Sequence, residues 1–237
     1  MKKVIGVLAA LCVMAGSVFA RGVYDGDIQL HLGVGLDSVA AEKSVSESGI
    51  TTTTTSEFGD TTFDFDLETW HLFNFNDVFG LGFMVGFNGG VGGTTKMTTS
   101  FSNSAGGSGY VSMPSDKLDF ACHFNGIIGP AVGINLGNIV KFDIALGMAY
   151  GFSMFAYTDD SATRNKTAAF LVGGVGFGTE VQAKFVPASP VSPVIGYRLA
   201  IIPSKTGVTI GSNSTTETYD SVAYVNNEIY VGISFNW

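Results

Sequence analysis

The sequence predicts an all-β protein, a transmembrane up-and-down antiparallel β-barrel of eight strands. Three observations lead to this fold class. Apolar and polar residues alternate in segments of strand length. Glycine, with 32 residues, reaches about twice its average usage. After residue 20 no apolar run is long enough for a membrane helix. A chain that crosses a membrane without helices must close a barrel, because only closure pairs every backbone group in lipid.

The last residues of the chain carry the clearest alternation. Ile229, Val231, Ile233, Phe235 and Trp237 alternate with polar or small residues up to the final aromatic ring. A period of two places these five side chains on one face of a strand. A strand embedded in a bilayer needs such a face toward lipid and favours an aromatic ring at the interface.

The first 20 residues predict a secretory signal peptide. A charged start precedes an apolar stretch and a run of small residues, which indicates cleavage between Ala20 and Arg21. A lipoprotein signal ending at Cys12 is the alternative, but a leucine precedes this cysteine where such signals have a small residue. We therefore expect residues 21–237 to form a single barrel domain.

The mature chain is strongly acidic. It keeps all 20 Asp and Glu but only ten of the 12 Lys and Arg, because Lys2 and Lys3 belong to the signal peptide. This charge argues against nucleic acid as a partner. The sequence also lacks metal-ligand spacing and a phosphate-binding glycine loop, so we expect no cofactor.

Eight alternating segments between turn signals are the predicted strands: residues 27–36, 61–73, 78–91, 116–134, 139–156, 167–185, 194–203 and 221–237. Two positions disturb the pattern. Trp70 and Leu72 fall out of phase with the apolar residues before them, which predicts a bulge near Glu68 or Thr69. Pro130 cannot donate a backbone hydrogen bond in a central strand, so the register of the residues that follow it is left open.

The predicted connections alternate between short and long. The short ones are residues 74–77, 135–138 and 186–193, and the long ones are residues 37–60, 92–115, 157–166 and 204–220. The long connections are rich in Ser, Thr, Gly and Asp and are predicted to be solvated loops. Three short turns and four long loops indicate an eight-stranded barrel with both termini on the periplasmic side.

With these features the chain resembles the small eight-stranded outer-membrane barrels of Gram-negative and related double-membraned bacteria. The resemblance covers the whole mature chain and rests on the signal ending at Ala20, the eight strands, the connection pattern and the terminal Ile233, Phe235 and Trp237. It implies that these three residues form the signal read by the barrel-assembly machinery. It also implies outer-membrane lipids and periplasmic chaperones as partners.

Charged residues gather on the faces opposite the apolar ones, inside the predicted barrel. Eight strands leave an interior just wide enough for side chains, so these charges are expected to pair as a structural core. An ion or proton path is the alternative, and it requires a continuous water column. The predicted lumen polar core comprises Asp64, Asp66, Glu68, Asp119, His123, Lys141, Asp143, Glu180, Lys184, Arg198 and Glu228.

Inward-facing glycines suggest a hollow toward the outer end of the barrel. A residue without a side chain either leaves space or makes room for a bulky neighbour. One hypothesis is a hollow that holds a small ligand, and the alternative is that aromatic side chains of other strands fill it. The glycines concerned are Gly33, Gly35, Gly86, Gly147, Gly151, Gly174 and Gly176.

The sequence leaves two functional hypotheses. Lipid-modifying barrels use His with Ser and a carboxylate near one rim, whereas His31, His71 and His123 stand beside no nucleophile motif, so we expect no enzyme.

In the first hypothesis the long loops present a surface to host or environmental partners. In the second the barrel is a narrow conduit or binding pocket for small or hydrophobic molecules. The family resemblance does not choose between them.

Overall fold

The computed structural model describes residues 23–113, 118–159, 166–210 and 215–237; the predicted signal peptide and its cleavage site lie outside these ranges. The described residues form nine strands: β1 Val23–Glu47, β2 Ile50–Asn74, β3 Phe79–Asn103, β4 Ser108–Met113, β5 Leu118–Leu136, β6 Val140–Asp159, β7 Lys166–Phe185, β8 Val191–Ile210 and β9 Thr215–Asn236. In the described part of the chain, no helix is long and apolar enough to cross a membrane.

Eight of these strands close into a ring. The order is β2, β1, β9, β8, β7, β6, β5 and β3, and pairing between β2 and β3 completes it. Each neighbouring pair is antiparallel. The first and last strands of the chain, β1 and β9, pair with each other. β4 pairs with β3 outside the ring. The predicted eight-stranded up-and-down barrel is thus confirmed.

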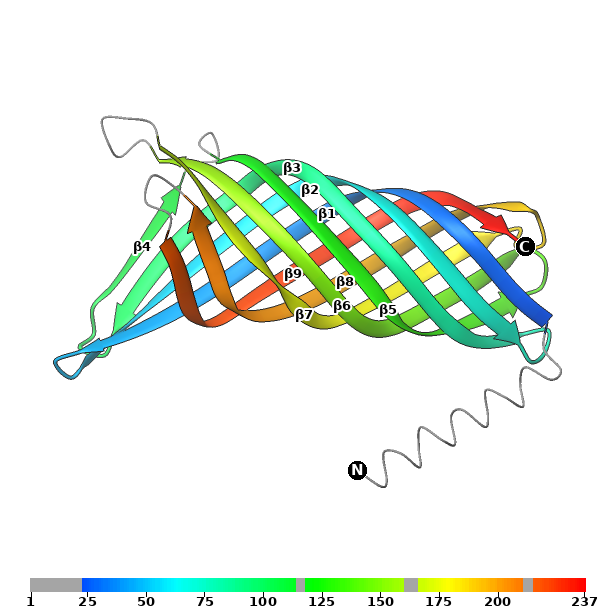
Figure 1. Ribbon diagram of the computed structural model, residues 1–237, viewed down its shortest axis with the longest axis horizontal. Coiled ribbons are helices and arrows are strands. Elements are labelled where there is room, and N and C mark those ends of the chain that lie inside the picture. Colours follow the sequence, from blue (N-terminus) through cyan, green and yellow to red (C-terminus); the bar gives the residue numbers. More distant parts are fainter. Residues whose placement is uncertain (1–22, 114–117, 160–165, 211–214) are drawn as a thin grey trace, which may run out of the picture.

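The two ends of the barrel differ. Residues 75–78, 137–139 and 186–190 form short turns at the end where β1 starts and β9 finishes (Figure 1). We call this the turn end, and the opposite one the hairpin end. The turns agree with the three predicted short connections.

Outward-facing side chains of the ring strands form an apolar belt. On β1 the side chains from Ile28 to Leu36 alternate between apolar residues that are 40–56% exposed and buried or small ones. Exposure of this extent on every ring strand suits contact with lipid rather than water. Members of the apolar belt include Leu32, Phe65, Phe83, Phe124, Ile144, Phe177, Ile195 and Val231.

The predicted bulge near Glu68 or Thr69 is wrong. Glu68 pairs with Gln29 in an unbroken β1–β2 register, and the shift in β2 lies instead at Gly59 and Asp60, against β3. Trp70 and Leu72 therefore keep the inward phase and are 1% and 0% exposed. The inward-facing residues of β2 change here from charged to apolar. They form an apolar layer inside the barrel, where the lumen near the turn end accepts large side chains.

Pro130 does not disturb the register of β5. It faces outward and pairs with Phe83 of β3. On the other side, the β5–β6 ladder omits Gly129 and Pro130, and the pairs that flank the gap keep one register. Proline has no N–H to donate, so the ladder loses bonds there without shifting.

Much of the sequence predicted as long loops is strand. β1 and β2 remain paired up to Glu47 and Ile50 around a two-residue turn, Ser48 and Gly49, whose φ angles are 51° and 79°. Positive φ at both positions matches the twist of a tight hairpin. The Thr-rich run that was expected to be a solvated loop lies within β2, because threonine favours strands even without an apolar partner residue.

These extensions form a sheet beyond the apolar belt, which we call the hairpin sheet. It consists of residues 37–47 of β1, 50–60 of β2, 94–103 of β3 and the whole of β4, and residues 37–42 of β1 also pair with β9 in the ring. The part of β1 after Leu36 spans about 37 Å at about 3.4 Å per residue. Figure 1 shows the β1–β2 hairpin and the β3–β4 hairpin projecting together from one side of the hairpin end.

Replacing Leu32 by arginine tests the position of the belt. Leu32 lies between Phe65 and Val231 of the neighbouring strands, so Leu32→Arg places a charge in lipid. We expect the free energy of unfolding in lipid vesicles to fall by about 2–4 kcal/mol, measured by denaturant titration. Ala40 faces the same way beyond the belt, and Ala40→Arg should cost less than about 1 kcal/mol. Equal costs would contradict the assigned belt.

Candidate functional site

The lumen of the barrel is filled by buried charged side chains, which we call the charged core. Among the described residues, nine carboxyl groups, three Lys or Arg and two His are at most 5% exposed. Charges removed from water need partners of opposite sign or hydrogen bonds. The members are Asp27, Asp37, Asp60, Asp64, Asp66, Glu68, Asp143, Glu180, Glu228, Lys141, Lys184, Arg198, His31 and His123.

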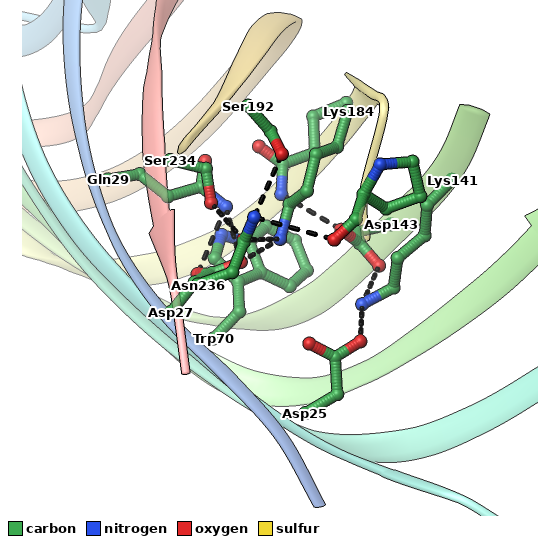
Figure 2. A network of polar contacts seen from close by, with 12 residues as sticks. Asp25, Asp27, Gln29, Trp70, Lys141, Asp143, Lys184, Ser192, Ser234 and Asn236 are labelled. Carbon is green, nitrogen blue, oxygen red and sulfur yellow. Dashed lines mark hydrogen bonds and ion pairs between the residues drawn. The ribbon is translucent and has the colours of Figure 1, made fainter. Parts of the chain in front are cut away.

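Two lysines organise the charged core near the turn end (Figure 2). The Lys141 Nζ of β6 lies 2.6 Å from Oδ2 of Asp25 and 3.3 Å from Oδ1 of Asp143. The Lys184 ammonium of β7 forms an ion pair with Asp27. Because Asp25 and Asp27 belong to β1, these pairs link opposite walls of the barrel and close the lumen at this level.

Arg198 occupies the middle of the charged core. Its Nη1 lies 3.0 Å from Oδ1 of Asp66 and 3.3 Å from Oε2 of Glu228, and its Nε donates to Oε2 of Glu180 at 3.1 Å. The guanidinium also forms an ion pair with Glu68. One cation from β8 therefore serves four carboxylates from β2, β7 and β9. We call these five residues the Arg198 cluster.

His123 organises the level closer to the hairpin end. Its Nδ1 lies 2.6 Å from Oδ2 of Asp37, and its Nε2 lies 2.5 Å from Oδ1 of Asn88. The Nδ2 of Asn88 donates to Asp66, so Oδ1 is the accepting atom. His123 therefore donates from Nε2 to Asn88. Its Nδ1 faces the Asp37 carboxylate, but among the described residues it has no hydrogen bond of acceptable geometry.

Aromatic rings cover the charged core at the hairpin end. The Phe58 and Phe170 rings stack with centroids 4.8 Å apart, and Phe155 lies 5.6 Å from Phe58. All three are at most 5% exposed. We call these three residues the aromatic cap. Phe58 lies in a segment predicted to be a loop, so the sequence did not point to this layer.

The structure places most of the predicted lumen polar core inside the barrel. Asp119 lies in β5, but its side chain is outside the described residues. The other ten predicted residues are buried in the lumen: Asp64, Asp66, Glu68, His123, Lys141, Asp143, Glu180, Lys184, Arg198 and Glu228. Sequence reasoning missed Asp27, Asp37 and Asp60. Asp27 and Asp37 share the inward phase of Gln29 and His31, and this signal was available.

The predicted glycine-lined hollow is not where the sequence suggested. A Cβ at Gly33 would meet the carboxylate of Glu228, and one at Gly35 would meet Asp64 and Thr62. These glycines make room for the charged core instead of leaving space. At the remaining positions a Cβ would also meet neighbouring side chains or backbone; these are Gly86, Gly147, Gly151, Gly174 and Gly176.

A cavity of about 660 Å³ opens at the turn end. Its polar lining includes Asp25 beside Lys141, together with Asn74, Asp77 and Asn135 from the turn regions. The cavity therefore lies at the end opposite to the predicted hollow. Its lining includes Asp25 and Asn236, which contact Lys141 and Lys184 respectively.

The hairpin sheet carries an exposed ion pair. Lys96 Nζ lies 2.9 Å from Oε2 of Glu57, and both side chains are about half exposed or more. The hydrogen bond and charge of Lys96 hold the pKa of Glu57 below its ordinary value. The pair therefore stabilises the fold above the ordinary pKa of Glu57 and loses this effect as the pH falls through the lowered pKa. Solvent screening keeps the contribution small.

Replacing Arg198 by methionine tests the charged core. Arg198→Met leaves four buried carboxyl groups without their guanidinium, and we expect the free energy of unfolding at neutral pH to fall by about 3–5 kcal/mol. Denaturant titration in lipid vesicles measures this loss. Lys96→Met removes an exposed partner instead and should cause no measurable change. Unchanged stability of Arg198→Met would show that the guanidinium does not hold the Arg198 cluster together.

Comparison with known proteins shows the fold. No family model matches the chain, and neither does any curated protein. The outer membrane protease OmpT from Escherichia coli is 10% identical, with 90% of this chain and 96% of that chain covered and a TM-score of 0.50. Ail, the attachment invasion locus protein of Yersinia pestis, is 12% identical over 91% of this chain and 99% of its own, with a TM-score of 0.43.

OprG from Pseudomonas aeruginosa is 11% identical over 92% of this chain and 97% of its own, with a TM-score of 0.44. Identities this low concern the fold and say nothing of activity or partners. The chain has the fold of the outer-membrane β-barrel proteins.

Proposed function

We propose that the protein resides in a bacterial outer membrane and displays the hairpin sheet to host or environmental partners outside the cell. The observation that carries this proposal is the extension of β1 and β2 to a turn at Ser48 and Gly49, far beyond the apolar belt. Strands this long exceed the 9–11 residues or so that a bilayer requires. Binding residues are commonly found on segments that a rigid scaffold holds away from its core.

The chemistry of the hairpin sheet favours a polar partner. Ser44 and Thr53 have hydroxyl oxygens 3.0 Å apart on neighbouring strands, and those of Ser46 and Thr51 are 2.8 Å apart. Residues 51–57 are half-buried or exposed throughout, in contrast to the strict alternation of the barrel wall. Hydroxyl groups both donate and accept hydrogen bonds, so this surface suits hydroxylated or amide-rich ligands.

The interior supports a closed barrel rather than a conduit. The ion pairs of Lys141, Lys184 and Arg198 cross the lumen at two levels, and the aromatic cap covers its hairpin end. Eight strands leave little room beside such side chains. We propose no enzymatic activity, because His123 donates from Nε2 to Asn88 and its other nitrogen faces the Asp37 carboxylate inside the filled lumen.

The same proposal places the turn end in the periplasm. Ile233 and Phe235 face outward there on the strand that closes the ring, and Trp237 follows it directly and is also exposed. This position leaves the three residues accessible to barrel-assembly machinery before β9 pairs with β1. Periplasmic chaperones would hold the chain until that step.

Epitope insertion tests the orientation. An epitope after Ser104 lies in the turn between β3 and β4, and one after Ser189 lies in the turn between β7 and β8. We expect antibody to label intact cells that carry the Ser104 insertion, whereas the Ser189 insertion is labelled after permeabilisation alone. The reverse pattern would invert the proposed topology.

Shortening the hairpin sheet tests its role in binding. Ala41 and Ser56 are register partners, so residues 42–55 can be replaced by an Asn-Gly turn that suits a hairpin. We expect vesicles carrying this variant to lose most of the binding that wild-type vesicles show on arrays of glycans and extracellular-matrix proteins. Binding is scored against empty vesicles, and heat-modifiable migration on gels confirms that the barrel still folds. Unchanged binding would contradict the proposal.

A further inference from the structure

We propose that the middle of the lumen holds one divalent first-row transition-metal ion, bound by His31, Glu68 and Glu180. One ligand atom from each of these side chains lies within 4.8 Å of the others. The three residues come from β1, β2 and β7 and are at most 1% exposed. This site is independent of the hairpin sheet and of the function proposed for it.

The surroundings of His31 fix which nitrogen carries the proton. Its Nε2 lies 2.9 Å from Oε1 of Gln29. The Nε2 of Gln29 donates to both carboxylate oxygens of Asp27 at 3.1 Å, so Oε1 is the accepting atom. His31 therefore donates from Nε2, and in the neutral ring Nδ1 carries a lone pair. Stacking on Tyr230, with centroids 4.2 Å apart, holds the ring in this orientation.

This lone pair points at carboxylate oxygens. Nδ1 of His31 lies 3.6 Å from Oε1 of Glu68 and 3.7 Å from Oδ2 of Asp66. Among the described residues none of these three atoms has a hydrogen-bond partner, although Oε1 of Glu68 forms an ion pair with Arg198. Arg198 meets the charge of Glu68 at this oxygen, whereas Nδ1 of His31 and Oδ2 of Asp66 are two buried electron-rich atoms that face each other. A cation between them removes the repulsion.

The distances suit a metal ion better than a hydrogen bond. A separation of 3.6 Å is too long for an N–H donor and a carboxylate oxygen. In a tetrahedral site with bonds of about 2.1 Å, two ligand atoms are about 3.4 Å apart. The distance between Nδ1 of His31 and Oε1 of Glu68 is close to this ligand–ligand distance. The oxygen of Glu180 lies within 4.8 Å of the other two ligand atoms, so its side chain must also move inward to complete the geometry.

The charge of the Arg198 cluster also favours a cation. Four buried carboxyl groups surround one guanidinium, so the cluster carries an excess of negative charge whenever more than one of the four is ionised. A divalent ion lowers this excess. Imidazole and carboxylate together are ligands for Zn²⁺, Mn²⁺ or Fe²⁺, whereas Ca²⁺ and Mg²⁺ prefer oxygen alone.

Neighbouring residues orient two of the proposed ligands. Gln29 accepts the Nε2 proton of His31, and the hydroxyl of Tyr230 donates to Oε1 of Glu180 at 2.5 Å. Such outer contacts are typical of protein metal sites, where they fix the tautomer and rotation of each ligand. The bound ion would join three strands across the lumen and act as a structural crosslink.

Zinc binding by the refolded mature barrel tests the site. The protein is refolded into detergent with equimolar ZnCl₂, passed over a desalting column and analysed for zinc by mass spectrometry. We expect about one zinc per chain in wild type and a loss of at least tenfold in His31→Gln. His71→Gln serves as the matched control, because His71 lies outside the charged core, and it should retain the zinc. Equal zinc in wild type and His31→Gln would overturn the proposal.

A second measurement decides the case if His31→Gln fails to fold. Crystals of the zinc-loaded wild-type barrel are measured at the zinc absorption edge. An anomalous peak between His31, Glu68 and Glu180 supports the site, and its absence there overturns the proposal. Absence would mean that a second proton on His31, rather than a metal ion, offsets the facing carboxylates.

Discussion

The pairing of β1 with β9 is the contact on which the rest of the structure depends. It begins at Asp27 and Asn236, and the backbone N–H of Trp237 adds a bond to the carbonyl of Gly26. Without this pairing two strand edges would face lipid, where unsatisfied backbone groups cost several kcal/mol each. Closure also creates an interior, and an interior enclosed by eight strands must be filled by side chains. The apolar belt and the charged core are two consequences of this one requirement.

The charged core contains more carboxyl groups than basic side chains. This imbalance is its most informative property. A structural core that only needed to fill space would be more stable with apolar residues of similar volume. The chain instead gathers carboxylates around Arg198 and His123 and retains glycines such as Gly33 that leave room for them. Retention of an uncompensated interior indicates that something positive, either protons or a metal ion, belongs to the folded state.

The sequence predicts the barrel well because its lipid-facing positions obey a strict period of two. The same rule places Asp66, Lys141 and Arg198 inside, since an inward phase needs no knowledge of their partners. It fails at Trp70 and Leu72, where the interior is apolar, because alternation assumes a polar lumen. It also fails beyond Leu36, where the outward face of the hairpin sheet is largely polar, so that the strand continues without the apolar outward residues that mark the barrel wall; Val39 and Phe58 are buried on the inner face there. The Ser48 and Gly49 turn was the remaining signal there. Arg198 pairs in register with Glu180 and Glu228 on the two adjacent strands, whereas closure of the ring brings Asp66 and Glu68 of β2 to it.

Several ion pairs of the lumen join residues that are far apart along the chain. Asp66 and Arg198 are separated by 132 positions, and Asp27 and Lys184 by 157. Such contacts carry a large loop-closure entropy and form late in folding. Before the ring closes, these charges are hydrated and lie on the open face of a curved sheet. Closing the barrel thus strips water from many ions in one step, which makes the last event of assembly highly cooperative and opposes partial insertion into the bilayer.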